Sequence, residues 1–569
     1  MLENIKKEAL NYLKSLEGEV TSEDMGTASS HGIRKWGGTP EEICTHLDDF
    51  ERRLKQYPTW KRLRGISQVI PHDPDFGVNI EKPKHIRWIE KINNNKLPSA
   101  QKKKLIKKFT RENPVADRLN NRQSHSKDVA EMAGMIAKRF GFSQENKKIM
   151  QITSLLHDMG HGPFNHYFQE AIEEVLPEYG LDKHLFEHNR NGLRKAEAMG
   201  APLSILKTLL YHDGKPLKES QHKYGINYLP AELKDFAKDI EKQPNLVQQA
   251  AALADDFAND TRDFAIIVKS SKSAGIGATI DEMREKLKLF DIAYHKVLDR
   301  EVYDMVLAEH NYSSINKPVS DILNSTPKNG NGRNGVTHIS YDSYENSTET
   351  DDYKDYLVEF GHYGQDENEY APYKKIDTTT EKLLWDTIWE MRSILIEDLS
   401  KETSRRSLLH KKQGRSPSDL RVEINGKLEP MVSLSENSEN NEYGINVKQE
   451  FSNGRSFIRK IYKEPEMLEK RSELNKKIKT IFKNAMDGKY EGLPGKIVAD
   501  LSKFEKKNVP QKKANQAKAK IILSHLSEMT DLEAFMTHQM VASKGRETRE
   551  DIMKTWVDKG WDISNQKTV

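Results

Sequence analysis

The chain has 569 residues, of which 36% are hydrophobic and 31% charged, so it can bury one large core or two moderate ones. Lys and Arg number 90 against 87 Asp and Glu, a formal charge of +3, so the bulk charge does not demand a nucleic-acid partner. A single cysteine, Cys44, excludes an intramolecular disulfide. No apolar run is long enough to span a bilayer, and we expect a cytoplasmic protein without a membrane partner.

The first part of the chain predicts helices separated by irregular segments. Residues 1–19 form an amphipathic pattern that contains acids and lacks the apolar stretch of a signal peptide. Residues 21–45 are rich in Gly, Ser and Thr and predict an irregular segment before a helix. Residues 46–70 predict a helix and a turn. The lysine-rich stretch within residues 81–112 could bind polyanions, but it is more typical of a solvated helix face.

A helix is predicted from Asn121 to about Phe140. Its apolar residues recur at i, i+3, i+4 and i+7, the spacing of one buried helix face. His125 lies four residues before Val129 and therefore points inward with that face. A buried histidine at the start of a helix is a candidate metal ligand.

The most informative stretch is residues 149–170, IMQITSLLHDMGHGPFNHYFQE. An apolar helix leads directly into the adjacent His157 and Asp158, and His161 and His166 follow after glycines have ended the helix. Imidazoles and carboxylates held on a rigid buried element are what a metal site needs. Two other His-Asp pairs, at 72–73 and 212–213, lack this context and are not expected to bind metal.

A third helix is predicted over the stretch that contains Asp255, Asn259 and Asp263, which recur every four residues and line one face. Two histidines and two aspartates on three or four helices could hold one divalent ion, with open positions for water and phosphate oxygens. Such donors accept Mn, Mg, Fe or Co, so the identity of the metal stays open.

The remainder of the chain predicts a polar insertion followed by more helices. Residues 311–378 are rich in Asn, Ser, Gly and Thr and contain one candidate β-hairpin, GVTHISYDSY. Helices resume at Thr379 and are interrupted by a polar break at 411–445, where Asn425-Gly426 predicts a short hairpin. The last helical zones are predicted at 464–487 and 511–544.

These residues together resemble a known family. Arg-x-x-His at 122–125, the His-Asp pair with its following histidines, and a distant Asp are typical of HD-domain phosphohydrolases. More narrowly, the chain resembles the deoxynucleoside-triphosphate triphosphohydrolases, which comprise bacterial dGTPases and the vertebrate SAM-and-HD dNTPases. Four further stretches support the narrower match: WKRLRGISQV (60–69), FEHNRNGLR (186–194), ADDFANDTRD (254–263) and SEMTDLEAF (527–535).

The resemblance implies roles for individual residues. It assigns the metal to His125, His157, Asp158 and Asp255. It assigns catalysis or phosphate contact to His161, His166 and His188. It assigns substrate binding to Arg122, Gln68, Val69, Asn259 and Asp263, with Gln68 and Asp263 holding the deoxyribose 3′-hydroxyl. The implied reaction is attack of water on the α-phosphate of a dNTP, dGTP among the candidates, which releases deoxynucleoside and inorganic triphosphate.

The resemblance also implies a mostly α fold with an HD-domain helical core, a helical C-terminal extension and minor β-hairpins. We expect four segments: an N-terminal segment at 1–45, the phosphohydrolase core at 46–310, the insertion at 311–378 and a helical C-terminal region at 379–569. The chain is expected to form a homo-oligomer, and an allosteric nucleotide or single-stranded nucleic acid is a candidate partner.

Three positions depart from the family pattern. Asn259 stands where a Tyr usually packs beside the sugar, and Asp256 stands where vertebrate members have a phosphate-binding Lys. Gln169 occupies the place of an acid that orients a catalytic histidine; the neighbouring Glu170 could replace it. These departures leave two alternatives open: an HD phosphodiesterase or nucleotidase acting on another nucleotide, and a catalytically weak nucleotide-sensing or nucleic-acid-binding protein.

Overall fold

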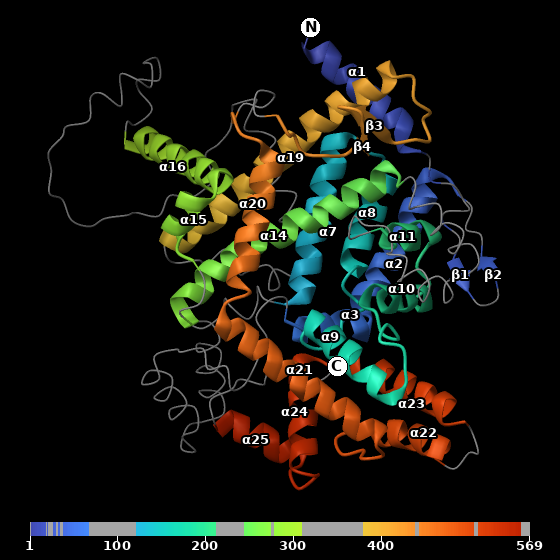
Figure 1. Ribbon diagram of the computed structural model, residues 1–569. Helices are drawn as coiled ribbons and strands as arrows, with labels where there is room; N and C mark the ends of the chain where they lie inside the picture. Colours follow the sequence, from blue (N-terminus) through green and yellow to red (C-terminus); the bar gives the residue numbers. More distant parts are fainter. Residues whose placement is uncertain are drawn as a thin grey trace, which may run out of the picture. The chain divides into compact units, whose positions relative to one another are not determined.

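The computed structural model describes residues 2–18, 20, 25, 27–29, 32–34, 38–67, 121–211, 244–274, 278–309, 379–437, 443–505 and 510–558. The described chain is mostly α-helical, as the sequence predicts, with two short antiparallel hairpins (Figure 1). The predicted hairpin in the insertion, the lysine-rich helix within 81–112, and the candidate substrate residues Gln68 and Val69 lie outside the described residues. None of the described helices is both long and apolar enough to cross a membrane.

The described chain divides into two compact units, Asp291–Glu390 and the remainder. The smaller unit contains most of α16 (Lys288–Glu309) and the beginning of α19 (Thr379–Lys412). Within it, Glu390 forms ion pairs with Lys296 and Arg300 at 3.5 and 2.8 Å. The candidate site lies wholly in the larger unit.

The centre of the larger unit is a set of packed helices. α7 (Arg122–Phe140), α8 (Gln144–Leu156) and α14 (Leu246–Ala274) contact one another, and their apolar faces form a core. The N-cap Asn121 accepts a hydrogen bond from the Ser124 amide, and Gly141, at φ +67°, ends α7. The larger unit also contains these helices before the C-terminal ones: α1 (Leu2–Glu17), α2 (Pro40–Gln56), α3 (Pro58–Arg62), the 3₁₀ turn η1 (Leu63–Gly65), α10 (His188–Ala198), α11 (Leu203–Leu209) and α15 (Ile280–Lys286).

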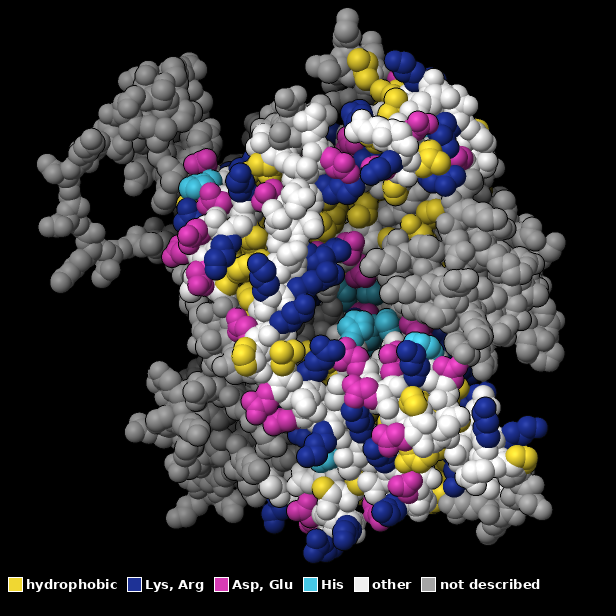
Figure 2. Space-filling view, viewed as in Figure 1, with side chains coloured by type: hydrophobic (Ala, Val, Ile, Leu, Met, Phe, Trp, Pro, Cys, Tyr) yellow, Lys and Arg dark blue, Asp and Glu magenta, His cyan; other side chains and the backbone are white. Residues whose placement is uncertain are grey.

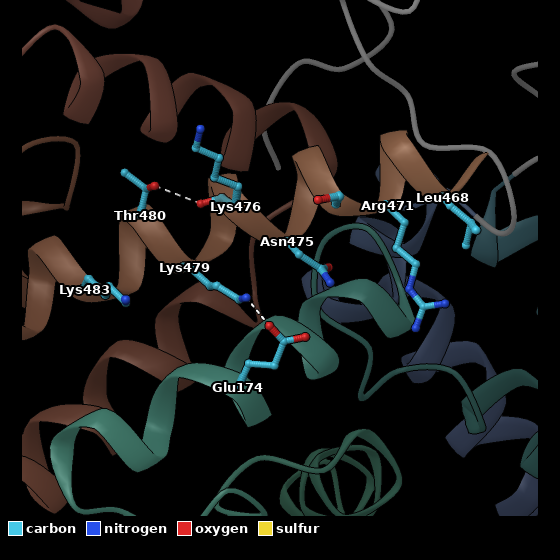
Figure 3. A pocket seen from close by; sticks show the side chains of 9 residues that line it. Glu174, Leu468, Arg471, Asn475, Lys476, Lys479, Thr480 and Lys483 are labelled. Atoms are coloured by element: carbon cyan, nitrogen blue, oxygen red, sulfur yellow. Dashed lines mark hydrogen bonds and ion pairs between the residues drawn. The ribbon is translucent and has the colours of Figure 1, made fainter. Parts of the chain in front are cut away.

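The C-terminal helices form a second bundle around α9 (His166–Val175) and the 3₁₀ turn η2 (Leu176–Tyr179). α21 (Pro465–Met486) packs along α9, and α24 (Asp531–Ala542) and α23 (Gln511–Leu526) pack on α21 (Figure 1). Ion pairs join α9 and η2 to α21. Glu174 of α9 pairs with Lys479 (Figure 3), and Glu178 of η2 pairs with Lys483. α22 (Gly495–Glu505) and α25 (Arg549–Asp558) complete the bundle.

The hairpin predicted at Asn425-Gly426 is confirmed. β3 (Arg421–Ile424) pairs with β4 (Lys427–Pro430), and the two turn residues have φ of +52° and +76°, as a tight two-residue turn requires. A second hairpin, β1 (Thr27–Ser29) with β2 (Gly32–Arg34), lies in the segment predicted to be irregular, and α2 begins inside the same segment at Pro40. The early start of α2 follows from a capping box between Thr39 and Glu42.

The C-terminal helices also differ in detail from the prediction. α20 (Val447–Ile461) lies outside the predicted helical zones. Its Gly454 weakens the helix signal in the sequence, but a side chain there would collide with Phe264 of α14, since a Cβ would lie 2.9 Å from the ring. The zone predicted at 511–544 divides into α23 and α24, because Thr530 and Glu533 form a capping box that starts α24.

Candidate active site

The first turn of α7 carries Arg122 and His125, both buried. The Arg122 amide donates to the Ile66 carbonyl at 3.0 Å, and Ser67 forms a β-bridge with Asn121. The start of the helix is therefore attached to the segment that ends at Ser67. This attachment fixes the direction in which Arg122 and His125 enter the core.

His157 follows the last residue of α8, and Asp158 follows His157. The Nδ1 of His157 lies 2.6 Å from the Ser154 carbonyl, to which it donates, so the ring is held in one orientation with Nε2 turned toward the acids. Gly160 allows α10 to approach this turn, because a Cβ at this position would lie 1.8 Å from the His188 carbonyl. The turn thus places His157, Asp158 and α10 against one another.

Both predicted aspartate ligands lie close to both predicted histidine ligands. Asp255 Oδ1 lies 3.2 Å from His125 Nε2 and 3.4 Å from His157 Nε2. Asp158 Oδ2 lies 3.2 Å from His157 Nε2 and 3.7 Å from His125 Nε2. Ligands bonded at about 2.1 Å to one ion are separated by about 3.0–3.4 Å when they are adjacent in tetrahedral or octahedral geometry. The spacing fits a single divalent cation.

The electrostatics of the four side chains also fit a cation. Burial alone would raise the pKa of Asp158, but Arg122 and His157 hold it well below its usual value. His157 and His125 likewise lower the pKa of Asp255 to about 2 against the effect of burial. Burial would lower the pKa of His157, but the two carboxylates raise it to about 9. Asp158 Oδ2 and Asp255 Oδ1 are buried acceptors that receive no well-formed hydrogen bond from the described residues.

Three further imidazoles form a cluster next to these ligands. The ring centroids of His161, His166 and His188 lie 4.2–5.1 Å apart. The pKa of His161 is well below its usual value, mainly because the ring is buried and also because of the positive charges of Arg122 and His188. His166 is exposed to solvent at its surface, but the dense packing around its ring, followed by the charges of His188 and Arg122, lowers its pKa. Histidine side chains gather in a hollow of the surface in Figure 2, with Lys and Arg side chains along one side.

This histidine cluster fits an anion better than a second cation. The three side chains include no carboxylate, and the charge of Arg122 acts on His161 and His166. Arg122 itself pairs with Asp158 and donates to Asn165 Oδ1. Neutral imidazoles beside a guanidinium can donate hydrogen bonds to phosphate oxygens.

Gln169 contacts the histidine that the sequence pattern associates with it. Gln169 Oε1 accepts from the His188 amide at 3.1 Å and lies 2.7 Å from His188 Nδ1. Because an amide oxygen only accepts, His188 Nδ1 carries the hydrogen, and Nε2 is the nitrogen left for chemistry. Gln169 in turn donates to Glu173 at 2.7 Å. Glu170 is engaged elsewhere: it pairs with Arg471 on α21, with one contact at 2.8 Å.

α14 carries the residues predicted to bind the sugar. Asp263 is buried and lies beside Tyr462, at the end of α20. Burial raises the pKa of Asp263 to about 7, although the nearby Tyr462 hydroxyl acts to lower it. Asn259 lies on the same helix between Asp255 and Asp263 and is half-buried. Tyr462 is not among the predicted site residues, since its proximity to Asp263 depends on a contact between residues about 200 positions apart.

Asp256 forms an ion pair with α20 and is not one of the predicted metal ligands. It pairs with Arg455 of α20 at 2.7 Å, and Arg455 also contacts Asp260 at 2.8 Å. Asp256 therefore contributes to the attachment of α20 to α14, and α20 is what brings Tyr462 to Asp263. The sequence alone identifies neither Arg455 nor Tyr462, because α20 itself is not predicted.

Comparison with known proteins identifies the central part of this structure. Residues 122–260 match the HD domain. The chain is 31% identical over 164 residues to a deoxyguanosinetriphosphate triphosphohydrolase-like protein of Allorhizobium ampelinum, a match that covers 26% of this chain and 38% of the relative. A protein of the same description from Neorickettsia sennetsu is 32% identical over 157 residues, covering 26% of this chain and 37% of the relative. The chain thus matches about two fifths of the length of these relatives.

Proposed function

We propose that this chain, an HD-domain protein of the deoxyguanosinetriphosphate triphosphohydrolase-like family, is a metal-dependent phosphohydrolase that cleaves dNTPs to deoxynucleoside and inorganic triphosphate. One observation carries the proposal. The two oxygens of Asp158 face different sites: Oδ2 faces the four-ligand cluster, and Oδ1 contacts Arg122 and lies 3.2 Å from His161. A phosphate group beside Asp158 would therefore lie between a cation and a set of hydrogen-bond donors.

The residues divide into two groups by chemistry. His125, His157, Asp158 and Asp255 would hold one divalent ion, which supplies a positive charge beside the phosphate oxygens and lowers the pKa of water. Arg122 would neutralise charge that develops on the phosphate during attack, and it is positioned for this by Asp158 and Asn165. Buried donors of this kind stabilise a transition state more strongly than donors in water do.

The histidine cluster supplies hydrogen bonds and a route for the proton. His161 remains neutral because it is buried, and dense packing together with the neighbouring positive charges lowers the pKa of the exposed His166, so both can serve as hydrogen-bond partners for phosphate oxygens. His188 is held through Nδ1, so its Nε2 can accept a proton from the attacking water. The leaving 5′-oxygen then takes up a proton, and the products are a deoxynucleoside and triphosphate.

The sugar would lie toward Asp263 and Tyr462. A carboxyl group with a pKa of about 7 can accept a hydrogen bond from the 3′-hydroxyl when it is ionised and donate one to it when it is protonated. Tyr462, at the end of α20, lies near this carboxyl group and would supply an aromatic side chain beside the sugar, where the chain has Asn259 in place of a tyrosine. Gln68 is the second residue that the resemblance assigns to this hydroxyl.

Analysis of the products tests the proposal. The purified chain is incubated with each dNTP and each NTP in the presence of Mn²⁺, Mg²⁺, Fe²⁺ or Co²⁺, and the products are separated by ion-exchange chromatography. We expect equal amounts of deoxynucleoside and intact triphosphate from at least one dNTP. Orthophosphate or pyrophosphate without triphosphate would instead indicate a nucleotidase or phosphodiesterase. Nucleotide binding without turnover in any of the metals would indicate a sensing protein, the outcome for which the neutral Gln169 provides a reason.

A further inference from the structure

Asp531, in the first turn of α24, is fully buried and joins two segments of the candidate site. Its Oδ1 accepts from the Phe164 amide at 2.7 Å. Its Oδ2 accepts from the Ser67 amide at 3.0 Å and from the Ser67 hydroxyl. Both oxygens of one carboxylate are therefore used, one on each segment, and both segments lie more than 360 positions before Asp531 in the chain.

The segment held through Phe164 is strained. Phe164 and Asn165 have φ of +59° and +63°, a backbone conformation that residues other than glycine adopt only when their surroundings impose it. Asn165 accepts the hydrogen bond from Arg122, and His166 follows it directly. The hydrogen bond that the Phe164 amide donates to Asp531 is one of the contacts that impose this conformation. The ring of Phe535, one turn further along α24, packs edge-on against the ring of Phe164 at 4.8 Å and supplies another.

The segment held through Ser67 leads to the other side of Arg122. Ser67 forms a β-bridge with Asn121, the N-cap of α7. The residue before Ser67, Ile66, accepts from the Arg122 amide at 3.0 Å. The single Asp531 carboxylate therefore fixes the main chain that positions Arg122 and the main chain that positions the partner of its guanidinium.

A second side chain strengthens the same junction. Arg62 donates to the Met529 carbonyl at 3.0 Å and to the His161 carbonyl at 2.8 Å. Residues 529–535 are thus bonded both to the segment at 62–67 and to the turn at 159–164. The C-terminal bundle is attached to the site where the phosphate donors are located.

We propose that Asp531 is a positioning residue for the phosphate-binding side of the site, which sets Arg122, Asn165 and His166 relative to one another. The three hydrogen bonds described above involve none of the metal ligands, and three of these ligands, His157, Asp158 and Asp255, lie on segments other than the two that Asp531 holds, so we expect the metal site to persist without it. The catalytic part of this inference rests on the proposed function. The geometric part does not.

Two substitutions of Asp531 and a matched control test its proposed positioning role. Asp531→Ala removes the hydrogen bonds to Phe164 and Ser67. Asp531→Asn retains the shape and one acceptor oxygen, but its amide group cannot accept from the other main-chain donor. Asp551→Ala is the control: Asp551 also lies in the first turn of a C-terminal helix and bonds Thr548, but it is exposed and remote from residues 62–67 and 159–166.

The measurements are steady-state kinetics, Mn²⁺ stoichiometry and amide hydrogen exchange of a peptide that spans 160–168. We expect kcat to fall roughly 10- to 100-fold in Asp531→Ala, with a smaller change in KM, and Asp531→Asn to recover part of the loss. Mn²⁺ binding should remain stoichiometric, and exchange in 160–168 should accelerate in both variants but not in Asp551→Ala.

Two results would overturn the inference. One is unchanged exchange at 160–168 together with unchanged kcat in Asp531→Ala. The other is an equal loss in Asp531→Ala, Asp531→Asn and Asp551→Ala, which would indicate a general effect on folding. If the unaltered chain hydrolyses no nucleotide, the proposed function fails, but the exchange measurement still decides whether Asp531 holds this segment.

Discussion

Asp128 should contribute several kcal/mol to stability, because it is the counter-ion of two buried arginines. It lies on α7 one turn after His125; it bonds Arg262 of α14, and its Oδ2 lies 3.6 Å from Arg392 of α19. The two arginine side chains are only 1% and 2% exposed. Asp128→Ala leaves both guanidiniums buried without this carboxylate. Removal of one partner from a buried ion pair costs about 3–5 kcal/mol, so we expect the free energy of unfolding to fall by that amount.

Urea denaturation followed by circular dichroism measures this change. With an m-value of about 3 kcal/mol/M, the midpoint should fall by about 1 M or more. Asp49→Ala is the matched control, because its ion pair with Arg52 is largely exposed and should contribute less than about 1 kcal/mol. Burial would raise the pKa of Asp128, but Arg262 and Arg392 lower it. Its stabilising effect is therefore present above the unfolded-state pKa of about 3.9 and is lost as pH falls through the depressed folded value. A midpoint within 0.3 M of the unaltered chain, by order of magnitude, would refute this reasoning.

Two further predictions concern turnover and specificity. His188→Ala should leave Mn²⁺ binding intact and reduce kcat roughly 10²- to 10⁴-fold, the contribution typical of general acid–base catalysis, and unchanged kinetics would remove His188 from the mechanism. Asn259→Tyr should increase the ratio of kcat/KM for dGTP over GTP, because an aromatic ring between Asp255 and Asp263 would pack where the ribose 2′-hydroxyl projects. A ratio that does not change would contradict this placement of the sugar.

Local patterns in the sequence predict the part of the site that lies on regular helices. The helical spacing from Asn121 to Phe140 and the apolar run before His157 each fix the direction of a ligand, and α7 and α8 occur where predicted. Asp255 is the harder case, since only the resemblance connects it with residues about 100 positions earlier. The structure brings Asp158 and Asp255 each within 3.7 Å of the His125 and His157 imidazoles, and the role of the four side chains as metal ligands is a proposal.

The residues that surround the site could not be predicted in the same way. Asp531 and Tyr462 act through contacts with residues hundreds of positions away, and no local spacing encodes such contacts. Gln169 is an intermediate example. Its departure from the family pattern is visible in the sequence, but only the structure shows that it bonds His188 and that Glu170 is paired with Arg471. The expected segment boundaries, homo-oligomer and allosteric nucleotide stay predictions.

Metal binding tests the central claim most directly. The purified chain is stripped with a chelator and titrated with Mn²⁺, and the free ion is followed by electron paramagnetic resonance. We predict one tightly bound ion per chain, lost in His125→Ala and in Asp255→Ala and retained in the exposed control Asp551→Ala. Stoichiometric Mn²⁺ in either ligand variant, or no bound ion in the unaltered chain, would contradict the four-ligand site.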